Sequence, residues 1–418
     1  MDPVLIVGAG IVGLTLGQAL KQKNIPFEIY ERDPNPDARG QGWAITLHWA
    51  LEYIQQILPA DTLARIQAVQ VDPDVARHDN GNFLFINLAT GEPVFKIPPS
   101  VRWRVNREKT RKALLHGIAD HVHWDHRVVG VDVPPAPAEP VALRFADGSR
   151  VAGRIVVGVE GSRSLVRQVL RPDAFSNVLL PIRFTGVAVD LTPAEIAPLR
   201  AMDPLLFQGC HPCSGTFFWF SMLETPAVNG TAGTPGERFR AQICMSWPVR
   251  SPADEVADSD AARLANMKRR AEGFVPFLYE AVQRIPDGTP VTEIRLADWE
   301  CLDWDNCVGR VTLAGDAAHA MTMCKCLPFG VRAQADEIDR GEAANHGLLD
   351  AYWLVHAIEK IYSGKADAKT ALDGYETEMR QRTRRAVRLS RQACRDAHAW
   401  EQLNETSAIL TKRAVDGA

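Results

Sequence analysis

The clearest hydrophobic pattern lies at the start of the chain, where a short apolar run is followed by a glycine-rich turn and a helical repeat. Residues 4–7 (VLIV) predict a buried parallel strand, and the apolar spacing of residues 14–20 predicts a helix. Residues 27–30 (FEIY) predict a second strand. Strand, helix and strand in this order predict an α/β fold built on a parallel sheet.

Later segments follow a different pattern, with short alternating runs that predict a second, mostly β part. Residues 76–100 alternate about a Thr-Gly turn and predict a hairpin that leaves the first part. Residues 216–223 and 240–247 predict strands of the same sheet. We therefore expect three units: a discontinuous nucleotide-binding domain (1–75, 101–178 and 294–365), a β-sheet domain that binds the substrate (76–100 and 179–293) and a C-terminal helical segment (366–418).

The arginine-rich stretch from residue 379 to residue 395 allows two interpretations. A nucleic-acid site would need aromatic residues between the arginines, and this stretch has none. Ala386, Val387, Leu389 and Ala393 form an apolar stripe at helical spacing. The stripe favours a surface helix that packs on the nucleotide-binding domain.

Composition limits the partners of the protein. The chain has 418 residues, of which 46% are hydrophobic and 23% charged, as is ordinary for a soluble globular protein. A net charge of −4 gives no electrostatic reason to expect nucleic acid or an anionic membrane. The longest apolar run is too short to span a bilayer, and Asp2 replaces the basic start of a signal peptide. We expect a cytoplasmic protein without a membrane span.

Cysteine usage gives no support to a disulfide framework. Eight cysteines are sparse for this length and predict reduced thiols. Cys210 and Cys213 have redox or zinc spacing, but no second pair with metal spacing lies nearby. We expect structural thiols and no metal site.

The first glycine turn has the spacing of a dinucleotide-binding fingerprint. Gly8 permits a tight turn, Gly10 lets a pyrophosphate approach the backbone, and Gly13 lets helix and strand pack closely. Glu31 ends the second strand, where a carboxylate would accept hydrogen bonds from ribose hydroxyls. Its charge argues against a 2′-phosphate on the bound nucleotide, so NAD and FAD both remain open at this stage.

Two later motifs distinguish between these cofactors. Residues 158–167 (GVEGSRSLVR) predict a strand end, a turn and a helix start, and residues 315–319 (GDAAH) follow another predicted strand. Together with the fingerprint, they closely resemble the FAD-dependent monooxygenases of the aromatic hydroxylase type, a single-component (group A) flavoprotein family common in fungal secondary metabolism. The resemblance covers residues 4–400. It implies a Rossmann-like FAD-binding domain with an inserted, mostly β substrate domain and a C-terminal helix.

The resemblance also implies cofactor contacts. Asp316 of the GDAAH motif would bond the ribityl chain of FAD. Arg107, which opens a predicted helix, would reach the cofactor, and Arg111 is a weaker candidate one turn later. Backbone N–H groups at the start of the helix near residue 342 would stabilise the reduced flavin. The remaining expected cofactor contacts are Arg32, Gly42, Glu160, Gly161, Gly341, Ala343, Ala344 and Asn345.

Candidates for the substrate site come from the β-sheet domain. Phe218, Phe220, Met245 and Trp247 would form a flat apolar wall over the flavin, with ordinary sheet core as the alternative. His48 is the best candidate for a catalytic base because it lies beside the expected ring-edge loop and can titrate near neutrality. Its alternative is a histidine at a helix start without a chemical role.

The family resemblance implies the reaction. NAD(P)H would reduce FAD, oxygen would add to it, and a flavin C4a-hydroperoxide would hydroxylate or epoxidise an electron-rich aromatic or alkene small molecule. The substrate would be aromatic, or polyketide- or alkaloid-like. Two alternatives remain: an NAD-linked dehydrogenase that uses only the first fingerprint, and an FAD-binding protein impaired by residues 324–339. A dehydrogenase would be colourless, whereas a flavoprotein would be yellow.

Residues 324–339 interrupt the last motif. Their flanks, GDAAHAMTM and RGEAANHG, read as one cofactor loop, whereas the residues between them do not continue it. Cys324-Lys-Cys326 can be encoded TGT AAG TGC, which contains the intron start GTAAGT. Residues 335–336 can supply the branch-point-like CTGAC, and residues 338–339 a terminal AG. Removing the bases between these marks leaves one tyrosine in frame. Our hypothesis is a translated intron; the alternative is a genuine lid loop.

Sequencing the mature transcript tests the intron hypothesis. We expect the message to join the codons of Met323 and Arg340 through a single tyrosine codon. A mature message that retains the codons of residues 324–339 would show that the segment is a real loop.

Overall fold

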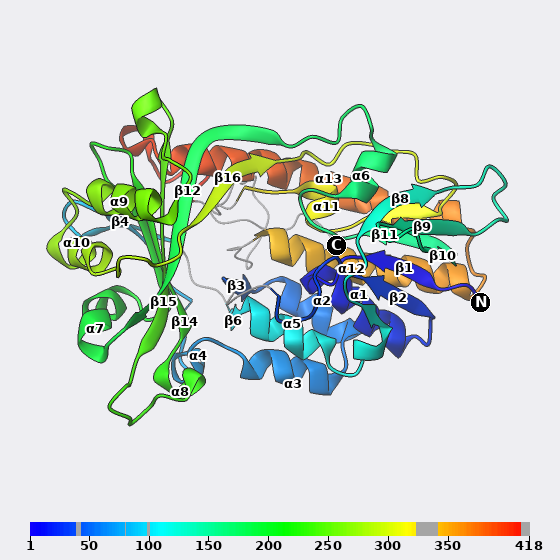
Figure 1. The fold of residues 1–418 in the computed structure, drawn as a ribbon, viewed down its shortest axis with the longest axis horizontal. Helices are drawn as coiled ribbons and strands as arrows, with labels where there is room; N and C mark the ends of the chain where they lie inside the picture. The colour runs from blue at the N-terminus through cyan, green and yellow to red at the C-terminus, as the bar shows by residue number, and fades with distance from the viewer. Residues whose placement is uncertain (39–42, 80, 98–100, 323–341, 411–418) are drawn as a thin grey trace.

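The computed structural model describes residues 1–38, 43–79, 81–97, 101–322 and 342–410, which form two lobes side by side (Figure 1). The first lobe contains a five-stranded sheet with the order β17-β11-β1-β2-β7, in which every pair of neighbours is parallel. Its central strand is apolar and buried throughout, as a strand covered on both faces must be. The strands are β1 (Val4–Val7), β2 (Phe27–Tyr30), β7 (Val122–His123), β11 (Ile155–Gly158) and β17 (Val311–Leu313).

Helices and a small sheet surround the parallel sheet. Helix α1 (Ile11–Gln22) packs against α12 (Glu342–Tyr362), which also contacts α2 (Ala50–Ile57). An antiparallel sheet of β8 (Val128–Asp132), β9 (Val141–Phe145) and β10 (Arg150–Gly153) lies beside β11. The shorter elements of this lobe are α3 (Ala60–Ala68), α5 (Arg107–Leu115), η1 (Ala119–His121), α6 (Leu165–Leu170) and α11 (Asp316–His319).

The second lobe is a seven-stranded sheet with the order β16-β12-β15-β14-β13-β4-β5. All neighbours are antiparallel except β13 and β4. Helices α7 (Pro193–Met202), α9 (Asp260–Arg270) and α10 (Pro276–Gln283) cover its outer face (Figure 1). The strands are β4 (Phe83–Asn87), β5 (Pro93–Ile97), β12 (Val178–Leu191), β13 (Leu206–Cys210), β14 (Phe217–Glu224), β15 (Phe239–Pro248) and β16 (Thr292–Asp298).

A two-stranded antiparallel sheet lies at the junction of the lobes. It pairs β3 (Ala44–Leu47) with β6 (Trp103–Asn106), and both strands contact β14 of the large sheet. The inner face of the large sheet is therefore turned toward the first lobe. The remaining short helices are α4 (Pro73–Ala76), α8 (Pro226–Asn229), η2 (Pro252–Asp254) and η3 (Trp400–Gln402).

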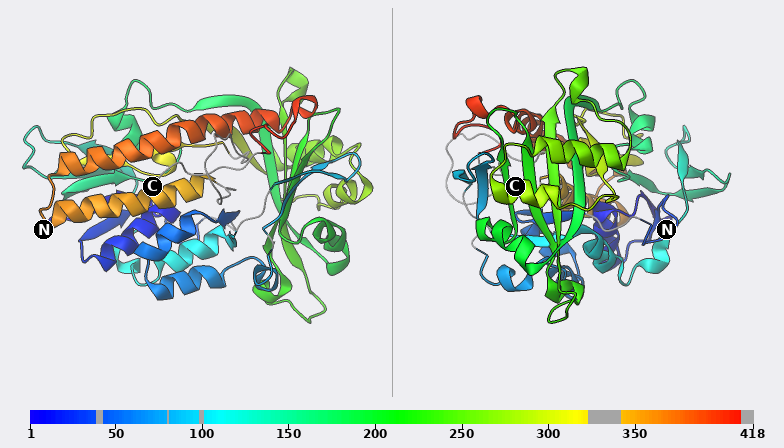
Figure 2. Two further views of the ribbon diagram at one scale, coloured as in Figure 1. Left: turned by 180° about the vertical axis from the view of Figure 1, so that it is seen from behind. Right: turned by 60° about the vertical axis from the view of Figure 1, so that its left-hand side comes forward.

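Helix α13 (Ala368–Asp396) runs along the length of the molecule and joins the two cores (Figure 2). Leu372 and Met379, near its start, belong to the apolar core of the first lobe, whereas Ala393, near its end, belongs to that of the second. The sequence predicted this helix for its arginine-rich half. The structure extends it toward the N-terminus and shows that its apolar stripe contacts both lobes.

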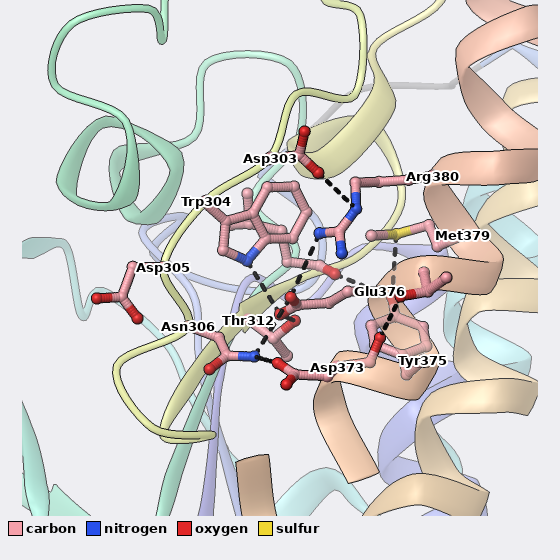
Figure 3. A network of polar contacts seen from close by, with 12 residues as sticks. Asp303, Trp304, Asp305, Asn306, Thr312, Asp373, Tyr375, Glu376, Met379 and Arg380 are labelled. Atoms are coloured by element: carbon pink, nitrogen blue, oxygen red, sulfur yellow. Dashed lines mark hydrogen bonds and ion pairs between the residues drawn. The ribbon is translucent and has the colours of Figure 1, made fainter. Parts of the chain in front are cut away.

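Glu376 fixes the first part of α13 to the first lobe (Figure 3). Its carboxylate is 1% exposed and accepts hydrogen bonds from the hydroxyl of Thr312 (2.8 Å) and the indole N–H of Trp304 (3.0 Å). The neighbouring Tyr375 hydroxyl donates to the carbonyl of Leu313 (2.9 Å). Thr312 and Leu313 belong to β17, so α13 holds the strand that leads into the GDAAH turn.

The predicted α/β class is confirmed, and the differences from the predicted elements are small. Helix α5 begins at Arg107, as predicted, and α2 begins at Ala50 rather than at His48. No helix in the described part of the chain is long and apolar enough to cross a membrane. Cys210 is buried and Cys213 exposed, and each is a free thiol.

Candidate functional site

The turn between β1 and α1 is shaped by its glycines. Gly8 adopts φ = +113°, which side chains disfavour, and a Cβ on Gly13 would lie 2.1 Å from the carbonyl oxygen of Gly8. Gly10 precedes α1 and receives no side-chain cap, and a Cβ built on it would meet no described atom within 4 Å. Gly10, Ile11 and Val12 line the cavity described below, so the start of α1 borders open space, as a phosphate-binding helix end requires.

Glu31 lies beside this turn at the end of β2. One carboxylate oxygen accepts a hydrogen bond from the N–H of Ala9 (2.8 Å) and the other accepts from the N–H of Asp33 (3.1 Å). The residue is only 4% exposed, so its carboxylate has a fixed position next to the glycine turn. Arg32, which follows it, is exposed.

The two arginines of α5 have different positions. The guanidinium of Arg111 is buried and donates to the carbonyl of Ala9 (2.8 Å) and to that of Pro36 (3.0 Å), and it lies over the ring of Trp124. Arg111 thus supports the glycine turn through its hydrogen bond to the backbone of Ala9. Arg107 is half-buried and lines the cavity described below, as expected of a residue that contacts the cofactor.

The GDAAH turn follows β17 and opens α11. Gly315 adopts φ = +61°, and Val12 of α1 packs against it. Asp316 is exposed although the residues on both sides are buried, and it lines the same cavity as Gly10. A carboxylate held in this way is available to hydroxyl groups of a ligand.

Asp350 of α12, which the sequence analysis missed, holds this turn in place. Its buried carboxylate accepts hydrogen bonds from the N–H of Gly315 (2.7 Å), from Arg382 of α13 (2.7 Å) and from the ring of His319. Burial opposes ionisation of Asp350, but the charges of His319 and Arg382 lower its pKa to about 2. The spacing of residues 315–319 gave no signal for a partner more than thirty positions later.

The motif of residues 158–167 is tied to the same turn by Arg167. Its guanidinium donates to the side chain of Asn177 (2.8 Å) and to the carbonyl of Asp316 (3.4 Å). Burial lowers the pKa of Arg167 to about 10. Glu160 accepts from the N–H of Val166 (2.8 Å) at the start of α6, and burial raises the pKa of its carboxyl. Gly161, with φ = +87°, lines the cavity.

The start of α12 is described from Glu342 onward. Ala343 and Ala344 line the cavity, as their predicted position beside the flavin requires. Asn345 is buried, and its side chain donates to the carbonyl of Thr46 (3.0 Å) and accepts from the N–H of His48 (3.1 Å), which ties α12 to β3. Gly42, Gly341 and residues 324–339 lie outside the described residues, so the predictions for them stay predictions.

His48 lies at the end of β3 and is 4% exposed. Its Nε2 is 3.2 Å from the side-chain nitrogen of Asn345, and its ring also approaches Trp49. The described residues that line the cavity include Ala44, Ile45 and Thr46 but not His48. Its catalytic role therefore stays a prediction.

One cavity of about 430 Å³ connects the glycine turn with the large sheet. Its cofactor side is lined by Gly10, Arg107, Gly161 and Asp316. Its far side is lined by residues of the junction and of the inner face of the large sheet: Trp43, Thr46, Arg104, Phe184, Phe217, Trp219, Gln242 and Cys244.

The predicted apolar wall is displaced by one residue along each strand. Phe218 and Phe220 of β14, with Met245 of β15, are fully buried in the apolar core that includes residues of α9 and α10. Trp247 is also fully buried, with the guanidinium of Arg270 of α9 above its ring at 4.3 Å. Side chains alternate along a strand, so the wall belongs to their neighbours, among them Phe217, Trp219 and Cys244.

Comparison with known proteins gives the class of the chain. No protein-family model matches the chain. The chain is 39% identical over 405 residues to the FAD-dependent monooxygenase dbaB of Emericella nidulans, covering 96% of this chain and 97% of that protein. It is 31% identical over 377 residues to the FAD-dependent monooxygenase tazP of Aspergillus terreus, covering 84% of this chain and 88% of that protein.

Solved structures share the fold at low sequence identity. The 2,6-dihydroxypyridine-3-hydroxylase of Arthrobacter nicotinovorans matches with a TM-score of 0.71 at 20% identity, over 100% of this chain and 98% of that one. Klebsiella pneumoniae HpxO, complexed with FAD and uric acid, matches with a TM-score of 0.71 at 19% identity, over 95% of this chain and 89% of that one.

The chain belongs to the family of FAD-dependent monooxygenases. It is therefore an oxidoreductase with FAD as its cofactor, as the sequence motifs predicted, and the alternative of an NAD-linked dehydrogenase is removed. The described residues fit FAD, because an uncapped helix start at Gly10 and the exposed acid Asp316 line one cavity with Arg107.

Replacement of Asp316 tests its contact with FAD. We expect Asp316→Asn to weaken FAD binding about tenfold or more, because a hydrogen bond to a charged acceptor stabilises by roughly 1.5–3 kcal/mol. The measurement is the dissociation constant of FAD from the apoprotein, with the flavin-to-protein absorbance ratio after purification. Asp287→Asn, at an exposed surface ion pair, is the control. Equal FAD affinity in both variants would refute the contact.

Asp350 predicts a pH-dependent stability. Its folded pKa of about 2 lies below the ordinary value of 3.8, so its contribution is complete above about pH 4 and is lost as the pH falls toward 2. We expect Asp350→Asn to reduce the free energy of unfolding by about 2–3 kcal/mol at neutral pH. Urea unfolding of both proteins should show this difference narrowing below pH 4, whereas a constant difference would contradict the ion-pair role.

Proposed function

We propose that the protein is an NAD(P)H-consuming monooxygenase that hydroxylates or epoxidises an electron-rich aromatic or alkene small molecule in secondary metabolism. One observation supports this proposal above all: the cavity that begins at the glycine turn and Asp316 ends at an aromatic wall. A planar substrate placed against Phe217 and Trp219 would lie in the same cavity as the flavin. We also propose a cytoplasmic location, where NAD(P)H is available.

The residues that would hold FAD are distributed along the cavity. The start of α1 at Gly10 would bind the pyrophosphate, and Glu31 the ribose hydroxyls. Asp316 would bind the ribityl chain, and Arg107 would lie along the cofactor. The start of α12, with Ala343 among its residues, would direct backbone N–H groups toward the flavin ring.

The proposed reaction converts substrate, O₂, NAD(P)H and one proton to oxygenated substrate, NAD(P)⁺ and water. FAD supplies the oxygen transfer, by the C4a-hydroperoxide route that the family resemblance implies. The protein must hold the target carbon and exclude water. Phe217, Phe184 and Cys244 suit this task, since each lines the cavity and is less than 5% exposed.

Flavin content and oxygen consumption test the proposed function. We expect the purified protein to be yellow and to consume O₂ and NAD(P)H together, faster when a phenolic substrate is present. The same measurements should compare the 418-residue chain with a variant in which one tyrosine replaces residues 324–339. If this segment is a translated intron, the shortened variant binds FAD more tightly and turns over faster.

Two results would contradict the proposal. A flavin-loaded shortened variant without NAD(P)H-dependent oxygen use across a panel of phenols, enols and alkenes would refute monooxygenase activity. Oxygen use that ends only in hydrogen peroxide, with no oxygenated product detected by mass spectrometry for any member of the panel, would refute it as well.

A further inference from the structure

Arg104 of β6 lines the cavity on its substrate side and is 6% exposed. One terminal nitrogen of its guanidinium donates to the hydroxyl of Thr46 (2.8 Å), and the other donates to the hydroxyl of Ser221 (2.6 Å). Both partners are neutral. The ring of Trp219 lies beside the guanidinium, with its centre 5.9 Å from Cζ.

No carboxylate of the described residues lies within ion-pair distance of Arg104, and its Nε is buried without a hydrogen-bond partner among them. Arg102, two residues earlier, is equally buried but forms a bidentate ion pair with Asp79. Its Nε and one terminal nitrogen donate to the two carboxylate oxygens, at 2.7 and 3.1 Å. A buried charge without a counter-charge is costly, so proteins normally pair it as Arg102 is paired. Arg104 departs from this pairing, and its guanidinium borders the cavity.

The guanidinium of Arg104 is charged under ordinary conditions. Burial, together with the nearby charge of Arg102, lowers the pKa of Arg104 to about 9, which is still above neutral pH. The cavity therefore contains a fixed positive charge next to an aromatic surface. Gln242 and Thr46 are neutral polar groups in the same lining, and neither can balance that charge.

We propose that Arg104 determines substrate specificity, and that the substrate is an aromatic molecule with an anionic oxygen, a carboxylate or an ionised phenol, which pairs with this guanidinium. The inference rests on the proposed function, because it assigns a substrate class to the same cavity. An arginine fork matches two anionic oxygens of a carboxylate or one phenolate oxygen. The positive charge would also favour ionisation of a phenol, and the phenolate form has a more electron-rich ring than the neutral phenol.

Three resorcinol-based probes separate these possibilities. The carboxylate arm is 2,4-dihydroxybenzoate, and the phenolate arm is 2,4-dihydroxybenzaldehyde, whose phenol is acidified by the carbonyl group. Resorcinol itself is the neutral comparison. Binding to the FAD-loaded protein is measured by calorimetry in mildly alkaline buffer, and needs no turnover. We expect one or both anionic probes to bind at least about 30-fold more tightly than resorcinol, the usual effect of a buried charge pair.

Variants of Arg104 separate charge recognition from a structural role. We expect Arg104→Gln to remove the preference for the anionic probe while resorcinol binds as before, and Arg104→Lys to restore part of it. Ser221→Ala is the matched control, because it removes one hydrogen bond of Arg104 but leaves the charge in place. This control should keep the preference within about threefold of wild type. Flavin content and the unfolding midpoint show that each variant is folded.

Equal affinity of the wild-type protein for all three probes would overturn the proposal, even if Arg104→Gln failed to fold. A preference for the anionic probes that survives in folded Arg104→Gln would overturn it too. So would an equal loss of this preference in Ser221→Ala and Arg104→Gln, because that result would give Arg104 a purely structural role. These outcomes are independent of the proposed function, whose failure is an absence of NAD(P)H-dependent oxygenation.

Discussion

The buried carboxylate of Asp350 is the interaction on which the cofactor side of the cavity depends. It binds the backbone N–H of Gly315, the ring of His319 and the guanidinium of Arg382, and so fixes α12, the GDAAH turn and α13 relative to one another. Since Asp350 binds the turn through Gly315 and His319, Asp316 between them is left to line the cavity. A buried carboxylate is tolerated because every partner supplies a donor and Arg382 supplies the opposite charge.

Close backbone packing completes this arrangement. A Cβ on Gly347 of α12 would lie 2.6 Å from the side chain of Val12 and 3.3 Å from the Cα of Gly315. The starts of α1 and α12 and the end of β17 therefore meet at one point, which larger side chains would separate. Three segments far apart in the chain are thereby brought to one cavity. Helix α13 holds them through Arg382, and it continues into the core of the substrate lobe.

The two sides of the cavity differ in how one buried charge on each side is balanced. On the cofactor side, the carboxylate of Asp350 forms an ion pair with Arg382. On the substrate side, Arg104 has only hydroxyl partners among the described residues. The cofactor side is thus held rigidly before any ligand arrives, whereas the substrate side keeps an unbalanced charge that selects among ligands.

The sequence alone determined the fold class, and it predicted much of the cofactor site. Glycine turns and the acids near them are local features, so Gly8, Gly10, Gly13 and Glu31 could be identified from spacing, and the GDAAH motif identified Asp316. Tertiary structure decided which residues support these turns, because Asp350 and Arg167 bind partners far away in the sequence. It also decided which face of β14 and β15 borders the cavity. Alternation defines two faces of a strand, but only the packing of α9 and α10 on one of them leaves the other to the substrate.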